Sequence, residues 1–425
     1  MSTSDVPRSH DRRSLVDRLN EDCFCIEIDK ARLADEFASR SGDGSANEVS
    51  PNLFSTVPVF VDRSDYDAMV AVVAAVEHAV GSGSYRTRVL SWAPEIARHD
   101  FGPIGVFTGY DFHLTPEGPR LIEINTNAGG AFLCALVATS QSPCCPEVEP
   151  AIARPSLPEF EAAVMAMFER EWRRQRPTAT LRSIAIVDDT PLEQPLHAEF
   201  KLARALFEHH GIESRIVDPR DLLHHEGKLT VDGRPIDLVY NRLVDFDLGR
   251  PEHRSLRAAY LAGDVVVTPA PRAHALFADK RNLVLLSDPV AMAQIGLAAE
   301  DLAALGAVPS TVRLTAADAE ALWADRKSYF FKPFGGHAGK AVYRGDKITT
   351  TVWEHIVSEG RHVAQRSVQP SHRNVLVDTV AMDRKADIRL YTHGGDVLLA
   401  AARIYQGQTT NFRTIGGGFA PVIVL

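Results

Sequence analysis

Two carboxylates and an amide occur at a spacing that suits a cation site. Asp111 precedes Glu123 by twelve residues, and Asn125 follows Glu123 by two. The segment 108–130 predicts two short strands with a turn at 116–118, and alternate residues of a strand share a face, so the three side chains can meet. Mg²⁺ accepts oxygen donors of this kind together with phosphate oxygens and water. An ordinary hairpin with polar residues on its solvent face has the same spacing, and spacing alone favours that interpretation.

A lysine followed by a glycine-rich loop forms a second candidate site. Lys332 stands near the end of the apolar strand predicted at 329–333, and Gly335, Gly336 and Gly339 follow it. Glycines let a backbone approach phosphates and present N–H groups to them, and the lysine supplies a positive point charge. A flexible hairpin without any ligand would show the same pattern.

Three further segments carry groups that suit a nucleotide or another anion. Lys280 opens a predicted helix after a proline-rich stretch, although a lone lysine is usually a solvated surface residue. The strand predicted at 362–370 leaves into an extended segment whose backbone can pair with an adenine edge, but read alone it is only a strand end. Arg389 and Arg403 flank a glycine turn, and arginine makes bidentate contacts with phosphate or carboxylate.

The elements that must position these residues divide the chain into five regions. Strands and helices alternate after residue 181, which predicts an α/β unit with a parallel sheet. Helical apolar spacing predicts a helix near 65–80, a charged helix is expected at 159–174, and an amphipathic helix is expected at 198–210. The expected regions are an N-terminal tail and loop region (1–50), a segment with the candidate metal hairpin (51–150), a linker and helix (151–180), an α/β substrate-binding domain (181–270), and a nucleotide-binding and lid region (271–425).

Composition and charge exclude several classes of protein. A chain of 425 residues predicts two or three packed modules. The net charge of -9 comes from well-mixed acidic and basic residues, so no nucleic-acid partner is expected. No apolar run is long enough to span a membrane, and the first 25 residues lack the apolar stretch of a secretory signal. The sequence therefore predicts a cytoplasmic protein with no membrane partner.

The cysteines do not form a recognisable functional pattern. Their odd number, in a large chain without a secretory signal, argues against a disulfide framework, and adjacent cysteines do not have metal-ligand spacing. We expect buried or loop thiols at Cys23, Cys25, Cys134, Cys144 and Cys145.

In combination, these motifs resemble the ATP-grasp superfamily. The segment YDF…LIEINTNAGG resembles the family's metal motif, in which Asp111, Glu123 and Asn125 match the metal ligands. That motif normally ends the domain, but here it precedes both lysines by about 150 residues or more, as in the circularly permuted branch typified by eukaryotic-type glutathione synthetase. The resemblance assigns nucleotide contacts to Lys280, Lys332, Gly335, Gly336, Gly339, Gln365, Arg366, Ser367 and Val368.

The middle of the chain resembles the substrate-binding domain of that enzyme. Gln194 and Arg242 match residues that contact the peptide substrate, and Arg403 matches an arginine that meets the substrate and the transferred phosphate. The resemblance assigns catalytic roles to Arg403, Lys332 and Arg389, and substrate contacts to Gln194, Asn241, Arg242, Thr126, Asn127 and Gly129. It also implies a homodimer.

The resemblance implies an α/β fold of the α+β ATP-grasp kind, with a circularly permuted ATP-grasp domain beside an α/β substrate-binding domain. It implies an ADP-forming ligase that uses ATP and Mg²⁺ to join a small-molecule carboxylate to an amine through an acyl phosphate. A kinase of the same fold and a non-catalytic nucleotide-binding scaffold are the alternatives. The family's metal-binding glutamate is replaced in the glycine loop by Gly335-Gly336-His337, and the lid loops are shorter, so glutathione is not the expected product.

Overall fold

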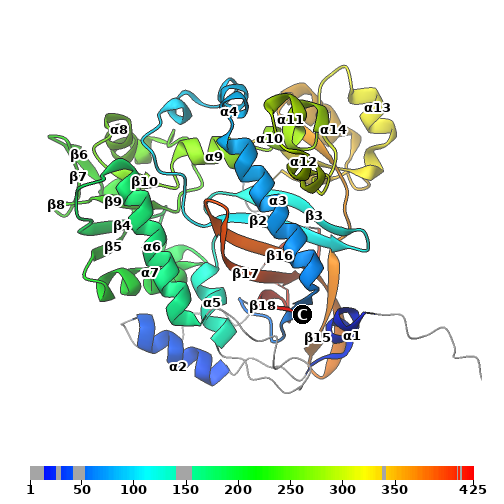
Figure 1. Ribbon diagram of the computed structural model, residues 1–425, viewed down its shortest axis with the longest axis horizontal. Helices are drawn as coiled ribbons and strands as arrows, with labels where there is room; N and C mark the ends of the chain where they lie inside the picture. Colours follow the sequence, from blue (N-terminus) through cyan, green and yellow to red (C-terminus); the bar gives the residue numbers. More distant parts are fainter. Residues whose placement is uncertain are drawn as a thin grey trace, which may run out of the picture.

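The computed structural model describes residues 14–24, 30–41, 53–139, 156–336, 341–408, 410–411 and 414–425. Its central element is a seven-stranded sheet in the order β1-β18-β17-β16-β2-β3, with β15 paired to the first half of β16 (Figure 1). In this sheet β1 and β18 pair in parallel, and the other pairs of described strands are antiparallel. The strands are β1 (Val59–Val61), β2 (Thr108–Thr115), β3 (Gly118–Asn125), β15 (Ser371–Val377), β16 (Val380–His393), β17 (Asp396–Tyr405) and β18 (Gly418–Val424).

The predicted hairpin is confirmed as β2 and β3. Gly118 has a φ of 98°, which an L side chain rarely adopts, and it closes the turn between the two strands. The pairing shifts by one residue between Phe112 and Asp111, and this irregularity sets Asp111 directly opposite Glu123, so the two carboxylates lie side by side as predicted. The hairpin continues the sheet through β16, where Asp111 also lies opposite Arg389.

One face of this sheet is covered by the long helix α3 (Arg63–Gly81), which confirms the helix predicted near 65–80 (Figure 1). Its buried residues, including Val72 and Val76, share a hydrophobic core with Tyr110 of β2 and Ile388 of β16. Burial of these side chains fixes the sheet that carries the candidate residues. The helices α4 (Gly83–Leu90), α10 (Arg281–Leu286), α11 (Pro289–Ile295) and α12 (Ala299–Leu305) extend the same core.

A second, parallel sheet follows in the order β10-β9-β4-β5, as the alternating pattern predicted. A hairpin turns at Asp232-Gly233 between β7 and β8, whereas β9 leaves that hairpin and joins the parallel sheet. The elements are β4 (Ser183–Val187), α7 (His197–His209), β5 (Glu213–Val217), β6 (Leu223–His225), β7 (Lys228–Val231), β8 (Arg234–Pro235), β9 (Leu238–Asn241), α8 (Arg254–Ala262) and β10 (Val266–Thr268).

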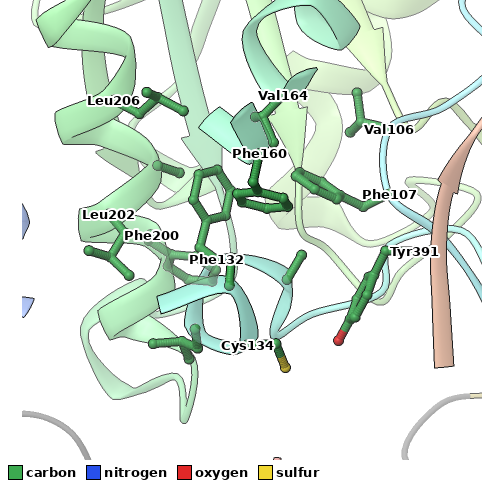
Figure 2. Close-up of a cluster of buried hydrophobic side chains, with 14 of the residues drawn as sticks. Val106, Phe107, Phe132, Cys134, Phe160, Val164, Phe200, Leu202, Leu206 and Tyr391 are labelled. Atoms are coloured by element: carbon green, nitrogen blue, oxygen red, sulfur yellow. The ribbon is translucent and has the colours of Figure 1, made fainter. Parts of the chain in front are cut away.

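The parallel sheet joins the central sheet through a shared aromatic core. Helices α5 (Ala131–Thr139) and α6 (Leu157–Gln175) lie between them, and α6 confirms the helix predicted at 159–174. Figure 2 shows Phe107, Phe132 and Phe160 beside Tyr391 and Cys134 in this core. Cys23 and Cys134 are buried thiols, in agreement with expectation, and Cys25, Cys144 and Cys145 lie outside the described residues.

A third, smaller sheet has the order β11-β14-β12-β13 and carries Lys332. It follows α9 (Pro271–Phe277) and consists of β11 (Thr311–Arg313), β12 (Tyr329–Pro333), β13 (Tyr343–Arg344) and β14 (His362–Arg366), with α13 (Ala319–Ala324) and α14 (Thr350–Glu359) packed beside it. Within the described residues, no helix combines the length and apolarity that crossing a membrane requires.

The N-terminal region corrects the expectation of a tail and loops over residues 1–50. Two parts of it are helical, α1 (Leu15–Asp22) and α2 (Lys30–Ser41). Ser14 caps α1 with a reciprocal capping box. The fully buried guanidinium of Arg373 then donates hydrogen bonds to the backbone carbonyls of Asn20, Cys23 and Pro58. These contacts tie α1 to β15, and they join residues about 350 positions apart, so the local sequence did not reveal them.

Arg373→Met is expected to lower the free energy of unfolding by about 2 to 4 kcal/mol. The methionine leaves several buried carbonyls without hydrogen-bond donors, and each such carbonyl destabilises the fold by about 1 to 3 kcal/mol. This loss is offset in part because the substitution also removes a buried charge. Thermal unfolding would show a lower midpoint, and limited proteolysis would release the N-terminal helix. Arg384→Met, on the neighbouring strand position, is the matched control and should change the midpoint much less. Equal shifts in both variants would contradict this role.

Candidate functional site

Asp111 lies in a row of charged side chains that crosses three strands of the central sheet. Arg389 donates to Asp111 Oδ1 through Nε at 2.6 Å and to Oδ2 through Nη2 at 2.7 Å. Oδ2 also accepts a hydrogen bond from Nη2 of Arg403 on β17 at 2.8 Å and another from Asn125 Nδ2 at 3.0 Å. The structure therefore brings the predicted metal motif and both predicted arginines into one cluster.

The two predicted lysines reach this cluster from the third sheet and its preceding loop. Lys280 Nζ lies 3.1 Å from Glu123 Oε1. Lys332 Nζ donates to the carbonyl of Ile122 at 3.0 Å and to Gln365 Oε1 at 2.6 Å. Both lysines are buried. The hairpin and the third sheet thus face each other across a set of ionic groups, although more than 150 residues separate them in the chain.

The ionic groups hold the two hairpin carboxylates in their charged forms. Burial raises the pKa of Asp111, but Arg389 and Arg403 more than offset it and hold that pKa below its usual range. Burial likewise raises the pKa of Glu123, and Lys280 and Lys332 bring it below its usual range. Burial lowers the pKa of the Lys332 ammonium to about 8. The site therefore contains a positive charge that titrates close to neutral pH.

The glycine loop begins next to Lys280. The backbone N–H of Lys280 donates to the carbonyl of Phe334 at 2.9 Å, directly before Gly335 and Gly336. A side chain at Gly335 would meet no atom within 4 Å, so packing does not require glycine there. Gly339 and His337 lie outside the described residues. The described part of the loop is placed beside both lysines, where its backbone can contribute N–H donors.

The predicted adenine segment, Gln365 to Val368, leaves the same sheet. The N–H groups of Arg366 and Ser367 already donate to the carbonyls of Ser310 and Ser328. The Gln365 side chain is different, because its buried Nε2 has no hydrogen-bond partner. An unpartnered buried donor is costly and suits an acceptor on a bound ligand.

His113 holds this segment against the hairpin, and sequence analysis missed it. Its Nδ1 lies 3.0 Å from the carbonyl of Val368. It follows Asp111 by two positions on β2, so strand alternation could have drawn attention to it. His113 therefore joins the predicted adenine segment to the strand that carries Asp111.

The predicted substrate residues gather where β9 and the β3 hairpin end. Arg242 Nη1 donates to the carbonyl of Asn127 at 3.0 Å, and Asn127 Nδ2 donates to the carbonyl of Leu243 at 3.0 Å. Thr126 Oγ1 lies 3.3 Å from His274 Nδ1. The buried Nε of Arg242 has no hydrogen-bond partner. These residues therefore form one group with an available donor.

Two other predicted substrate residues are engaged by backbone atoms. The amide of Asn241 donates to the carbonyl of Pro269 and accepts from the N–H of Leu243, so both its polar atoms have partners. Gln194 donates to the carbonyl of Asp189 at 2.6 Å. Asn241 thus shapes the end of β9, and Gln194 shapes the loop after β4.

Close packing explains the small residues that follow Asn125. A Cβ on Gly129 would come within 2.3 Å of Leu196 Cδ1, and one on Gly130 within 2.2 Å of the Phe419 ring. The buried carboxylate of Glu199 accepts from the Gly130 N–H at 2.7 Å and so fixes the start of α5. Nothing in the sequence around Glu199 indicated this contact, because it depends on how α7 packs.

The donor chemistry of the hairpin fits a magnesium ion in part. Glu123 is ionised and keeps 29% of its side-chain surface exposed, and Asn125 carries an amide oxygen. Asp111 keeps 6% exposed, and both its oxygens have donors. Among the described residues, no group of three or more histidine, cysteine, aspartate or glutamate side chains could hold a metal ion. Glu123 and Asn125 are thus the residues that fit this ion.

Comparison with solved structures finds a likeness of fold. The chain is similar to the glutathione synthetase-like effector GSS30 from Globodera pallida in its apo form, with a TM-score of 0.55 and 12% identity over 93% of this chain and 96% of that chain. A putative gamma-glutamylcysteine synthetase from Methylobacillus flagellatus KT gives a TM-score of 0.45 at 11% identity over 83% and 87% of the two chains, which is too distant to carry an argument. No protein-family model and no curated protein matches the sequence. The chain therefore shares its mixed α/β fold with the glutathione synthetase-like effector.

Proposed function

We propose that this protein is an ATP-dependent ligase that joins a carboxylate to an amine. The observation that carries the proposal is the meeting of Lys280 and Lys332 with the hairpin of Asp111 and Glu123. Phosphoryl transfer needs positioned positive charge more than covalent help from the protein, and this cluster supplies both lysines and arginines. The likeness to a glutathione synthetase-like protein supports the same class of reaction.

Each group in the cluster has a distinct task in this proposal. Lys280 and Lys332 neutralise the phosphates of ATP, and the buried Gln365 amide donates to the nucleotide. Glu123 and Asn125 would hold Mg²⁺, which supplies further charge neutralisation when bound. Arg403 stabilises the charge that moves with the transferred phosphate.

The acid substrate is proposed to bind at the end of the parallel sheet. In this sheet β4 connects to β5 on one side, and β9 connects to β10 on the other, so the strand order reverses between β4 and β9. Ligands of open α/β sheets bind beyond the carboxyl ends of the strands at such a point. Arg242 follows β9 there, and its unpartnered Nε can bind a substrate carboxylate. Asp188 follows β4, and burial raises its pKa to about 7.

The proposal predicts a defined path for a carboxylate oxygen. A substrate carboxylate attacks the γ-phosphorus and releases ADP, and the amine then attacks the acyl carbon and releases phosphate with that oxygen. A panel of amino acids and short peptides, labelled with ¹⁸O in the carboxylate, should therefore give phosphate with one ¹⁸O, only when acid and amine are both present. Phosphorylation of an acceptor without free phosphate would indicate a kinase. No ATP consumption across the panel would indicate a non-catalytic scaffold.

The Lys332 pKa of about 8 predicts a pH-dependent affinity for ADP. Below that pH the ammonium is charged and attracts phosphate, and above it the charge is lost, so the Kd for ADP should rise about tenfold between pH 7 and pH 9. Lys332→Met should remove this dependence over the same range. Isothermal titration in both proteins measures it, and an equal pH dependence in the variant would assign the titration to another group.

A further inference from the structure

We propose that Asp111 positions an arginine pair and does not bind the metal ion, which is left to Glu123 and Asn125. The inference rests on the proposed function, because it concerns the metal of the bound nucleotide. It departs from the match of Asp111 to a metal ligand that the sequence motif implies. The contacts of the three side chains carry it.

Both oxygens of the Asp111 carboxylate already accept hydrogen bonds. Its Oδ1 accepts from Arg389, and its Oδ2 accepts from Arg389, Arg403 and Asn125, all at 2.6 to 3.0 Å. A divalent cation at Oδ2 would have to displace one of its three donors, and one at Oδ1 would have to share that oxygen with the Arg389 guanidinium. It would also lie against two fixed positive charges, which repel it. The geometry therefore disfavours direct coordination by Asp111.

Glu123 and Asn125 have the opposite arrangement. Glu123 keeps 29% of its side-chain surface exposed, and one oxygen, Oε1, lies 3.1 Å from the ammonium of Lys280. Asn125 uses Nδ2 to contact Asp111, so its Oδ1 remains as an oxygen donor. The two residues alternate on β3 and share a face. Both can bind a cation without breaking an arginine pair.

The same contacts show what Asp111 does instead. Arg403 is held from two sides, because Nε donates to Asp387 at 2.7 Å and Nη2 donates to Asp111 at 2.8 Å. Nη1 of Arg403 makes no hydrogen bond within the described part of the chain, and the side chain is 13% exposed. Asp387 also accepts from Thr410, which lies in the connection between β17 and β18. The two carboxylates thus orient a guanidinium whose remaining donors can bind an anion.

The test separates metal binding from anion binding. Mn²⁺ replaces Mg²⁺ as a probe in the presence of ADP. Unbound Mn²⁺ gives an electron paramagnetic resonance signal, and the loss of this signal measures Mn²⁺ binding. Asp111→Asn should keep the Mn²⁺ affinity within about threefold of wild type, whereas Glu123→Gln should weaken it at least about tenfold. Titration of inorganic phosphate into the Mn-ADP complex should show a loss of at least about tenfold in Asp111→Asn and in Arg403→Met. Asp383→Asn, on the exposed part of β16, is the matched control.

Each outcome has a defined meaning. Equal loss of Mn²⁺ affinity in Asp111→Asn and Glu123→Gln would overturn the inference. Unchanged phosphate affinity in a folded Asp111→Asn protein would also overturn it. Neither result would contradict the proposed function. Absence of Mn²⁺ and ADP binding in wild type would overturn both. If Asp111→Asn does not fold, crystals of wild type with Mn-ADP decide the question by anomalous scattering. Manganese coordinated by Glu123 supports the inference, and manganese coordinated directly by Asp111 refutes it.

Discussion

Lys332→Met is expected to lower ATP turnover by about a hundredfold to a thousandfold, a loss of about 2.7 to 4 kcal/mol of transition-state stabilisation. Lys332 is buried between the third sheet and the hairpin, so water cannot replace its charge on the phosphates. Turnover would be measured with the acid and amine pair that the labelled-oxygen panel identifies. Near-normal turnover would remove Lys332 from the mechanism.

The fold should tolerate this substitution. The pKa of Lys332 is depressed to about 8, so the charged ammonium is disfavoured in the folded state. Between about pH 8 and the ordinary pKa of a lysine, the unfolded chain binds more protons than the folded chain, so the free energy of unfolding rises with pH in this range. At neutral pH the buried ammonium is charged and lowers the stability of the fold, and methionine carries no such charge. Thermal unfolding checks this point. Lys327→Met, an exposed lysine close to the start of β12, is the matched control for turnover.

Glu123→Gln is expected to have a comparable effect on turnover, about a hundredfold to a thousandfold. The substitution keeps the size of the side chain but removes the charge that faces Lys280 and the proposed cation. The loss should be accompanied by a higher Mg²⁺ concentration for half-maximal rate, measured by titrating Mg²⁺ at fixed ATP. Glu117→Gln, at the exposed turn of the same hairpin, should behave like wild type. A variant with reduced turnover but unchanged Mg²⁺ requirement would place Glu123 outside the metal site.

Local sequence patterns predicted the parts of the site that depend on local structure. Strand alternation and turn position placed Asp111 close to Glu123, but they did not reveal the irregularity beside Asp111 that shifts its partner from Ile122 to Glu123. The helix over 63–81 followed from apolar periodicity in the same way. The lysines needed the family resemblance, because a single lysine in a sequence carries no sign of its burial.

Contacts between distant segments could not be predicted. Glu199 fixes the turn after β3 because α7 packs beside α5, and Arg373 holds α1 because β15 passes next to it. The pairing of Asp111 with two arginines depends on the order of β17, β16 and β2 in the sheet. Such contacts follow from tertiary packing and not from spacing along the chain.

The most direct test of the central claim is calorimetric titration of ADP into the wild-type protein, with Mg²⁺ and with EDTA. A nucleotide site at the lysines and the hairpin predicts saturable binding with Mg²⁺ and at least about tenfold weaker binding with EDTA, because Glu123 and the phosphates then face each other without the cation. Absence of binding by well-folded protein under both conditions would contradict the account.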